Sequence, residues 1–297
     1  VCDAQVEGAK LNSQVVSFAP RSAPQAGTYT FDVAQAAKGG SAGSVSLVLQ
    51  TVLLPLALAA GPSRLTLRGG THVAWSPPFD YLKRVYLPTL ARMGIRAKVN
   101  LRRWGWYPQG GGEVQVTIEG PGADGALTAL DQRHRGELLR VRGLSASSNL
   151  PKHIRVRQEK AALQTLRSNG VNARFEVVDA PSKSTGTVVF LWGEFEHTPA
   201  GFTSLGERGK PAERVAEEAA NELLEFLHGD AALERHLADQ VVLPMSLAAG
   251  ESQFTTGRVT QHLLTNAWVV NQFYPGRVRV EGKEGEPGSC WVGPYLR

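Results

Sequence analysis

The chain has 297 residues, of which 42% are hydrophobic and 20% are charged, and this composition excludes an intrinsically disordered protein. A net charge of +5 favours contact with a polyanion such as RNA, although many enzymes of similar charge bind no nucleic acid. The two cysteines, Cys2 and Cys290, lack the spacing of a zinc site, so we expect free thiols in a reducing cytoplasm.

The longest apolar stretch, residues 45–60, contains a proline and several polar residues and is too short to cross a bilayer. No charged segment followed by an apolar run and a cleavage site opens the chain. We therefore expect a cytoplasmic protein that has no membrane partner.

The first half of the chain alternates between helical and strand periodicity. The pattern predicts a helix over 43–60 that ends at Gly61, a strand over 64–68, a helix over 79–93 that ends at Gly94, and strands over 95–103 and 113–119. The connection 104–112 is rich in aromatic residues and glycine. It suits either close approach to a phosphate or a plain flexible hairpin.

A segment of the chain is repeated. Leu-Pro-Leu-Ala-Leu-Ala-Ala-Gly at 54–61 returns as Leu-Pro-Met-Ser-Leu-Ala-Ala-Gly at 243–250, each time followed by a strand and another helix. We infer at least two copies of one strand and helix unit, packed on similar sheets. The proline at the same place in each copy is expected to kink both helices.

The stretch between the copies has its own pattern. After a glycine-rich linker at 120–125, strands are expected near 137–142, 173–178 and 186–192, with a basic helix over 153–168. An amphipathic helix follows over 211–227, with Val215, Ala219, Leu223 and Phe226 on one side. These elements predict a small domain, 132–231, inserted into a large domain formed by 1–131 and 232–297.

His262 is the strongest candidate for chemistry. A strand or turn over 255–260 precedes it, and Leu263, Leu264, Ala267 and Val270 follow at helical spacing. The imidazole therefore lies at the positive end of a helix dipole, where a phosphate meets free N–H groups and the ring stays unprotonated and nucleophilic. A lone histidine is more often structural, and the polar residues around it also suit simple capping.

Two further polar segments are candidates for ligand binding. Asp239 and Gln240, in an otherwise apolar helix predicted over 231–249, suit a ligand hydroxyl or an interior polar pair. Pro77, Pro78 and Tyr81 open the helix at 79–93 and suit either a flat base or a plain helix start with rings in the core. No Walker motif occurs, so a P-loop mechanism is not expected.

Five motifs, in this order, resemble those of the RNA 3'-terminal phosphate cyclase family. Each alone is unspecific, but their order is specific, and the resemblance covers essentially the whole chain. They lie at 39–50, 69–81 (Gly-Gly-Thr leading to Pro-Pro-Phe-Asp-Tyr), 105–112 (Gly-Trp-Tyr-Pro-Gln-Gly-Gly-Gly), 238–244 (Ala-Asp-Gln-Val-Val-Leu-Pro) and 262–266 (His-Leu-Leu-Thr-Asn).

The resemblance implies an α+β fold with a large domain of repeated ββαβ-type units, three in the family, and an inserted small thioredoxin-like α/β domain. Family members begin with a strand and helix that carry a metal-binding glutamate, and this chain is expected to start after them. The metal-ligating residues are therefore left unknown.

The resemblance also implies the activity. An ATP-dependent enzyme of this family converts an RNA 3'-phosphate to a 2',3'-cyclic phosphate through a covalent histidine-AMP intermediate and an RNA-adenylate anhydride. His262 matches the nucleophile, while Pro77, Tyr81, Asp239 and Gln240 match positions that line the adenylate pocket. ATP and Mg²⁺ or Mn²⁺ are the expected cofactors, and RNA with a 3'-phosphate end is the expected partner.

Two other interpretations remain open. A non-catalytic, cyclase-like RNA-binding factor in ribosome assembly would lack the nucleophile, so the presence of His262 disfavours it. An enolpyruvyl transferase shares repeated αβ units, but it has no need of the motif at His262, and that interpretation rests on fold analogy alone.

Overall fold

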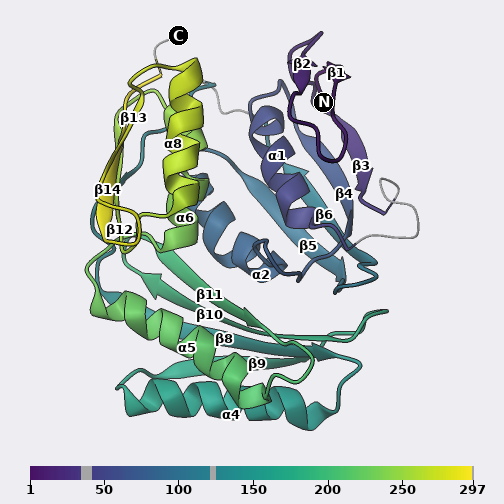
Figure 1. Ribbon diagram of the computed structural model, residues 1–297, viewed down its shortest axis with the longest axis vertical. Helices are drawn as coiled ribbons and strands as arrows, with labels where there is room; N and C mark the ends of the chain where they lie inside the picture. The colour runs from purple at the N-terminus through teal and green to yellow at the C-terminus, as the bar shows by residue number, and fades with distance from the viewer. Residues whose placement is uncertain (35–41, 121–124, 296–297) are drawn as a thin grey trace.

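The computed structural model describes residues 1–34, 42–120 and 125–295 (Figure 1). Its helices are α1 (Val45–Ala57), α2 (Phe79–Tyr81), the π-helical turn η1 (Leu82–Tyr86), α3 (Leu87–Arg92), α4 (Lys152–Ser168), α5 (Ala212–His228), α6 (Arg235–Gln240), α7 (Val242–Ser246) and α8 (Gln261–Phe273). None of these helices has both the length and the apolar character needed to traverse a bilayer.

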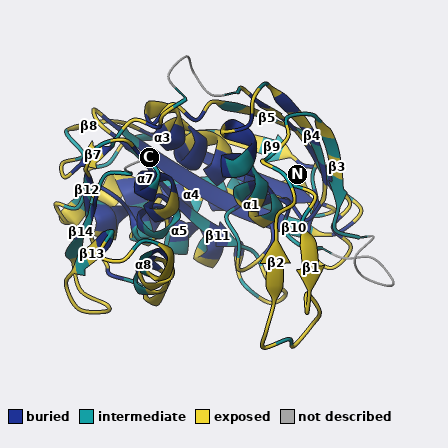
Figure 2. Ribbon diagram, turned by 90° about the horizontal axis from the view of Figure 1, so that it is seen from above, coloured by how far each residue is buried: buried dark blue, intermediate teal, exposed yellow. Residues whose placement is uncertain are grey.

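The strands form three four-stranded sheets and one small hairpin that protrudes into solvent (Figure 2). They are β1 (Gln5–Glu7), β2 (Ser17–Ala19), β3 (Thr28–Asp32), β4 (Ser63–Gly69), β5 (Ala97–Arg103), β6 (Gly112–Ile118), β7 (Asp131–Gln132), β8 (Leu138–Ser148), β9 (Ala173–Asp179), β10 (Gly186–Phe195), β11 (Pro199–Leu205), β12 (Ser252–Thr256), β13 (Val278–Glu281) and β14 (Gly288–Val292).

Two of the sheets have the same topology. The orders are β3-β4-β6-β5 and β7-β12-β14-β13, and in each the first pair is parallel while the other two pairs are antiparallel. Helix α1 precedes β4 as α6 and α7 precede β12, and a second helical segment follows each of these strands. The predicted internal repeat is confirmed, although its unit runs β-α-β-α-β-β and not ββαβ.

Two buried serines mark equivalent positions in the two copies. Ser63 opens β4 and Ser252 opens β12, and their side-chain oxygens accept hydrogen bonds from Gly27 N at 3.2 Å and Leu130 N at 3.0 Å. Gly27 directly precedes β3 and Leu130 directly precedes β7, so each bond joins the start of a central strand to the start of its parallel neighbour. The equivalence therefore extends to hydrogen bonding as well as topology.

The third sheet has the order β11-β10-β8-β9, with α4 and α5 on one face and the repeated units on the other (Figure 1). Alternate residues of β10 serve the two faces, as the period of a strand requires. Phe190 and Trp192 join the large core of the repeated units, while Val189 and Leu191 pack with α4 and α5. This sheet is thus covered on both faces.

Both ends of the segment that forms the third sheet are hydrogen-bonded to one residue of the second copy, Thr255. The Thr255 hydroxyl of β12 donates to the Arg133 carbonyl at 2.9 Å and accepts from Ala232 N at 3.0 Å. The sheet of β8 to β11 therefore lies, along the chain, between the first strand of the second copy and its first helix.

The α+β class is confirmed, whereas the division into 1–131 with 232–297 and 132–231, and the thioredoxin-like character of the latter, stay predictions. Strand β11 was missed, so the middle segment has one strand more than predicted. In α5, the four residues predicted to share one side are all buried.

The predicted end of the first helix was wrong. Helix α1 ends at Ala57 with Leu58 as its C-cap, and Gly61, at φ +116°, lies in the turn beyond it. The helix predicted over 79–93 is confirmed in its extent, because α2, η1 and α3 follow one another from Phe79 to Arg92, but its middle is the π-helical turn η1.

Candidate functional site

Helix α8 places His262 in its first turn. The Thr260 side chain caps this helix by accepting a hydrogen bond from Leu263 N at 3.1 Å. His262 is exposed, while Leu263 and Ala267 anchor the helix in the core. The predicted position at the start of a helix after a strand is confirmed, and the ring has access to solvent at the positive end of the helix dipole.

The predicted helix over 231–249 is instead two short helices, and this prediction was wrong. Leu233 is extended and forms a bridge with Thr256, and the Glu234 side chain caps α6 by accepting from His236 N and Leu237 N. The chain turns at Val241 and restarts as α7, which contains Pro244. Proline tolerates the first turn of a helix but not its interior, so the sequence favours this restart.

Asp239 and Gln240 lie at the end of α6 and line a cleft of about 280 Å³ together with Gln50 of α1 and Asn266 of α8. Asn266 Nδ2 donates to the Asp239 carbonyl at 2.9 Å, which fastens α8 to α6 one turn beyond His262. The sequence therefore predicted two residues that the structure brings beside the helix of the candidate nucleophile.

The cleft contains two polar groups in unusual environments. The Oε1 atom of Gln240 is buried without a hydrogen-bond partner among the described residues, an arrangement that is costly unless a ligand or water donates to it. Burial raises the pKa of Asp239 to about 7, with a further contribution from Glu234. Both features suit a polar ligand with hydroxyl or amino donors.

Tyr81 belongs to α2 and contacts the start of α6, and Pro77 precedes α2. Tyr81 is 3% exposed, and its hydroxyl donates to the Glu234 carboxyl group, which connects α2 to the start of α6. Burial raises the pKa of both groups, and the negative charge of Glu234 raises that of Tyr81 further. Pro77 is half-buried two residues before α2. Their role in a nucleotide pocket stays a prediction.

His236 was not predicted as a site residue, but it lies near His262. Desolvation of its ring lowers the pKa of His236, followed by the positive charge of Arg235, and the charged form of His262 disfavours protonation further. Arg235 Nε donates to His236 Nε2 at 3.1 Å. The sequence signal was limited to three consecutive polar residues, 234–236, before the apolar run.

The glycine-rich connection 104–112 has a structural explanation. A Cβ on Gly105 would lie 2.3 Å from the Gly69 carbonyl oxygen, so only glycine fits there. Trp106 is buried, and its Nε1 donates to Ser148 Oγ of β8 at 2.6 Å. His72, also buried, stacks on Trp104 at 4.4 Å between ring centroids. This segment joins the first copy of the repeat to the third sheet.

A metal centre formed by protein side chains is not found within 1–34, 42–120 and 125–295, where no three His, Cys, Asp or Glu residues lie close enough together to hold one ion. Both cysteines are free, with Cys290 buried in β14. The polar side chains that line the cleft are one carboxylate, Asp239, and three amides, Gln50, Gln240 and Asn266, a set that suits a ligand with hydroxyl and amino groups.

Comparison with known proteins agrees with the sequence motifs. The profile of the family described as RNA 3'-terminal phosphate cyclase matches residues 1–280. A protein of that name from Methylococcus capsulatus is 51% identical over 98% of this chain and 80% of its own length. Relatives of the same name include one from Nostoc punctiforme, 46% identical over 94% and 80%, and one from Methanopyrus kandleri, 40% identical over 99% and 83%.

Proposed function

Because the chain belongs to the RNA 3'-terminal phosphate cyclase family, we propose that it converts an RNA 3'-phosphate to a 2',3'-cyclic phosphate at the expense of ATP. The observation that supports this proposal most is the exposed imidazole of His262 in the first turn of α8. Its helix is fastened to α6, whose end lines a cleft with an unpartnered buried amide oxygen.

The first step is nucleotidyl transfer to the protein. A ring nitrogen of His262 attacks the α-phosphorus of ATP, forming an N–P bond while the bond to pyrophosphate breaks. His262 lies at the positive end of the α8 dipole, which stabilises the negative charge that develops on the phosphate.

The next two steps transfer AMP and close the ring. An oxygen of the RNA 3'-phosphate attacks the same phosphorus, which breaks the N–P bond and leaves a mixed anhydride. The neighbouring 2'-hydroxyl then loses its proton and attacks the RNA phosphorus, and AMP departs. Without the anhydride the leaving group would be a phosphate oxygen, so the intermediate divides one difficult displacement into easier ones.

The cleft suits the nucleoside part of ATP. Gln240 Oε1 accepts one donor, the Asp239 carboxylate accepts hydroxyl donors once it is ionised, and Gln50 adds an amide from the first copy of the repeat. Pro77 and Tyr81 are assigned to the same pocket on the resemblance alone. Mg²⁺ or Mn²⁺ supplies charge neutralisation of the triphosphate.

We also infer that 132–231 forms a separate inserted domain, because its helices share a hydrophobic cluster with one face of the third sheet. The free cysteines are consistent with a cytoplasmic location.

The test is adenylation of the purified protein with ATP labelled at the α-phosphate, in the presence of magnesium. We expect label that is stable to alkali and labile to acid, absent from a His262→Ala variant and present in a His228→Ala control at the end of α5. Label retained in His262→Ala would overturn the assignment. If RNA with a 3'-phosphate binds but is recovered unchanged, the non-catalytic assembly factor becomes the better interpretation.

A further inference from the structure

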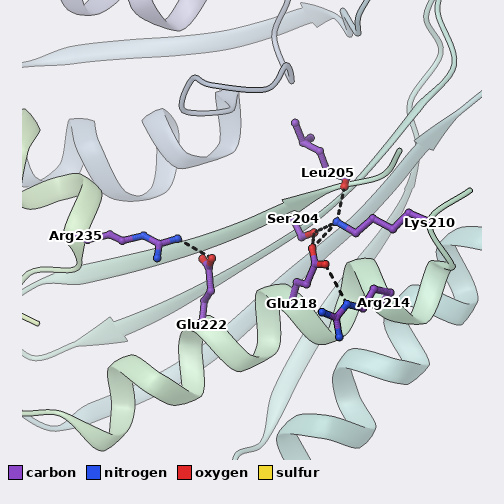
Figure 3. A network of polar contacts seen from close by, with 7 residues as sticks. All are labelled: Ser204, Leu205, Lys210, Arg214, Glu218, Glu222 and Arg235. Atoms are coloured by element: carbon purple, nitrogen blue, oxygen red, sulfur yellow. Dashed lines mark hydrogen bonds and ion pairs between the residues drawn. The ribbon is translucent and has the colours of Figure 1, made fainter. Parts of the chain in front are cut away.

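The start of α6 is held by a chain of polar contacts that reaches from α5 to the candidate site. Glu222 of α5 accepts a hydrogen bond from Arg235 Nη2 at 2.7 Å (Figure 3), and Arg235 Nε donates to His236 Nε2 at 3.1 Å. The three residues line a cavity of about 160 Å³ between α5, α6 and the connection from β12 to α8. Glu222 and Arg235 are about one-third exposed, so water screens their attraction only in part.

The direction of the second contact determines the state of His236. A guanidinium has only donors, so Nε2 of His236 must accept and carries no proton. The proton of the ring then resides on Nδ1, and the ring is uncharged. Desolvation and the charge of Arg235 also lower the pKa of His236.

We propose that Arg235, anchored by Glu222, is a positioning residue for histidine adenylation that keeps His236 neutral with its proton on Nδ1 beside His262. The lone pair on Nε2 is occupied, so His236 cannot accept the proton released at the nucleophile. Beside His262, His236 therefore acts as an uncharged ring whose Nδ1–H is its single hydrogen-bond donor. This inference rests on the proposed function and adds to it a link between α5 and the nucleophile.

Other charged groups near His236 also influence its pKa. Glu222 and Glu225 come from α5, Asp230 from the loop before α6, Glu234 from the N-cap of α6, Arg258 from the connection before α8, and His262 from α8 itself. Glu222 raises the pKa of His236, whereas Arg235 and His262 lower it. Arg235 is the group among them that donates directly to the ring, so its removal should have the largest effect.

The polar cluster around Glu218 on the same helix offers a matched control (Figure 3). Glu218 accepts from Lys210 and from Ser204 Oγ, one turn before Glu222, and these contacts do not involve α6. A Glu218→Gln variant therefore loses the ion pairs with Lys210 and Arg214 while leaving the contacts from Glu222 to His236 intact.

The first readout is the tautomer and titration of His236 in the full chain, measured by imidazole nitrogen NMR and assigned with a His236→Gln variant. We expect a single Nδ1–H tautomer in the unchanged protein and in Glu218→Gln. Arg235→Gln should mix the tautomers and raise the pKa of His236, because a donor and a positive charge are lost. Glu222→Gln should mix the tautomers without raising the pKa, because a negative charge is lost.

The second readout is the pH profile of adenylation by labelled ATP. Arg235→Gln is expected to lower the rate at pH 6 by about tenfold relative to the unchanged protein and to approach it at pH 8, since His236 then titrates in this range. Arg235→Lys should restore the profile in part, whereas Glu218→Gln should leave it unchanged.

Two outcomes would overturn the proposal. One is a His236 titration that is the same in the unchanged protein and in Arg235→Gln. The other is a rate deficit that is equal at pH 6 and pH 8 in a correctly folded Arg235→Gln protein. Because the NMR readout needs no turnover, absence of adenylation in every protein, including the unchanged one, would refute the proposed function separately.

Discussion

The two copies of the repeat share a topology but differ in what covers their second helical segment. In the first copy, this segment runs from α2 through η1 to α3 and lies against β11, with Val85 and Tyr86 almost fully buried. In the second copy it is α8, where Trp268 and Phe273 are 62% and 76% exposed. One fold unit therefore provides a core helix in one place and an accessible helix that bears His262 in the other.

The copies also meet at the candidate site. Position 50 in the first copy corresponds to position 239 in the second, because the repeated segments begin at 54 and 243. Gln50 and Asp239 line the same cleft, one on a continuous helix and the other at the end of a short one. The break after Gln240 is the main local difference between the copies, and it leaves the end of α6 at the cleft.

The largest effect is expected from a change in β11, the strand that covers the second helical segment of the first copy. A Cβ at Gly201 of β11 would lie 2.7 Å from Val85 Cγ2 and 3.1 Å from Tyr81 Cδ2. We expect Gly201→Ala to lower the free energy of unfolding by about 2 kcal/mol through overpacking, measured by urea denaturation. Gly257→Ala, where the nearest atom is 3.7 Å away, serves as the control and should cost much less.

Ser63 and Ser252 test whether the two copies are equivalent in energy as well as in topology. Each side chain accepts one backbone hydrogen bond in a buried position, so Ser63→Ala and Ser252→Ala should each cost about 1 to 2 kcal/mol in the same assay. Similar costs are expected because the environments match. A large cost at one position and none at the other would show that the copies are equivalent in topology only.

Asp239 distinguishes the second copy by its pH dependence. Its pKa is about 7 in the folded protein and near 3.8 when unfolded, so the folded state binds the proton more tightly. Its contribution to stability is therefore greatest below about pH 4 and is lost as pH rises to about 7. Asp239→Asn should be about 1 kcal/mol more stable than the unchanged protein at pH 8, measured by urea denaturation, with no gain at pH 4.

The smallest expected effect concerns the link between α8 and α6. Asn266→Ala removes the hydrogen bond to the Asp239 carbonyl at an exposed position, and we expect a loss of about 0.5 kcal/mol. Gln272→Ala, which removes a bond within α8 only, is the control. If both variants behave alike, the contact between α8 and α6 does not stabilise the second copy.

The sequence predicted those parts of the fold and site that depend on short spacing. The repeat at 54 and 243, the buried side of α5 and the position of His262 at a helix start all follow from periodicity and capping residues. Strand β11, however, was missed because Pro199 and Gly201 weaken its strand pattern.

Contacts between residues distant in the chain were outside the reach of pattern analysis. Tyr81 and Glu234 are 153 positions apart, and the pair exists only because α2 packs against the start of α6. His236 was missed for the same reason, since neither Glu222 nor His262 is near it in sequence. The extended backbone before α6 depends on Leu233 pairing with Thr256, which also requires the folded sheet.

The double contact of Thr255 determines how the middle segment can be removed or divided. Because the Thr255 hydroxyl is hydrogen-bonded to the backbone of both Arg133 and Ala232, the two ends of the middle segment lie close together beside β12. A shortened gene that joins these two positions would need only a very short bridge. A chain cleaved in a loop between β9 and β10 would likewise keep both of its pieces anchored to β12.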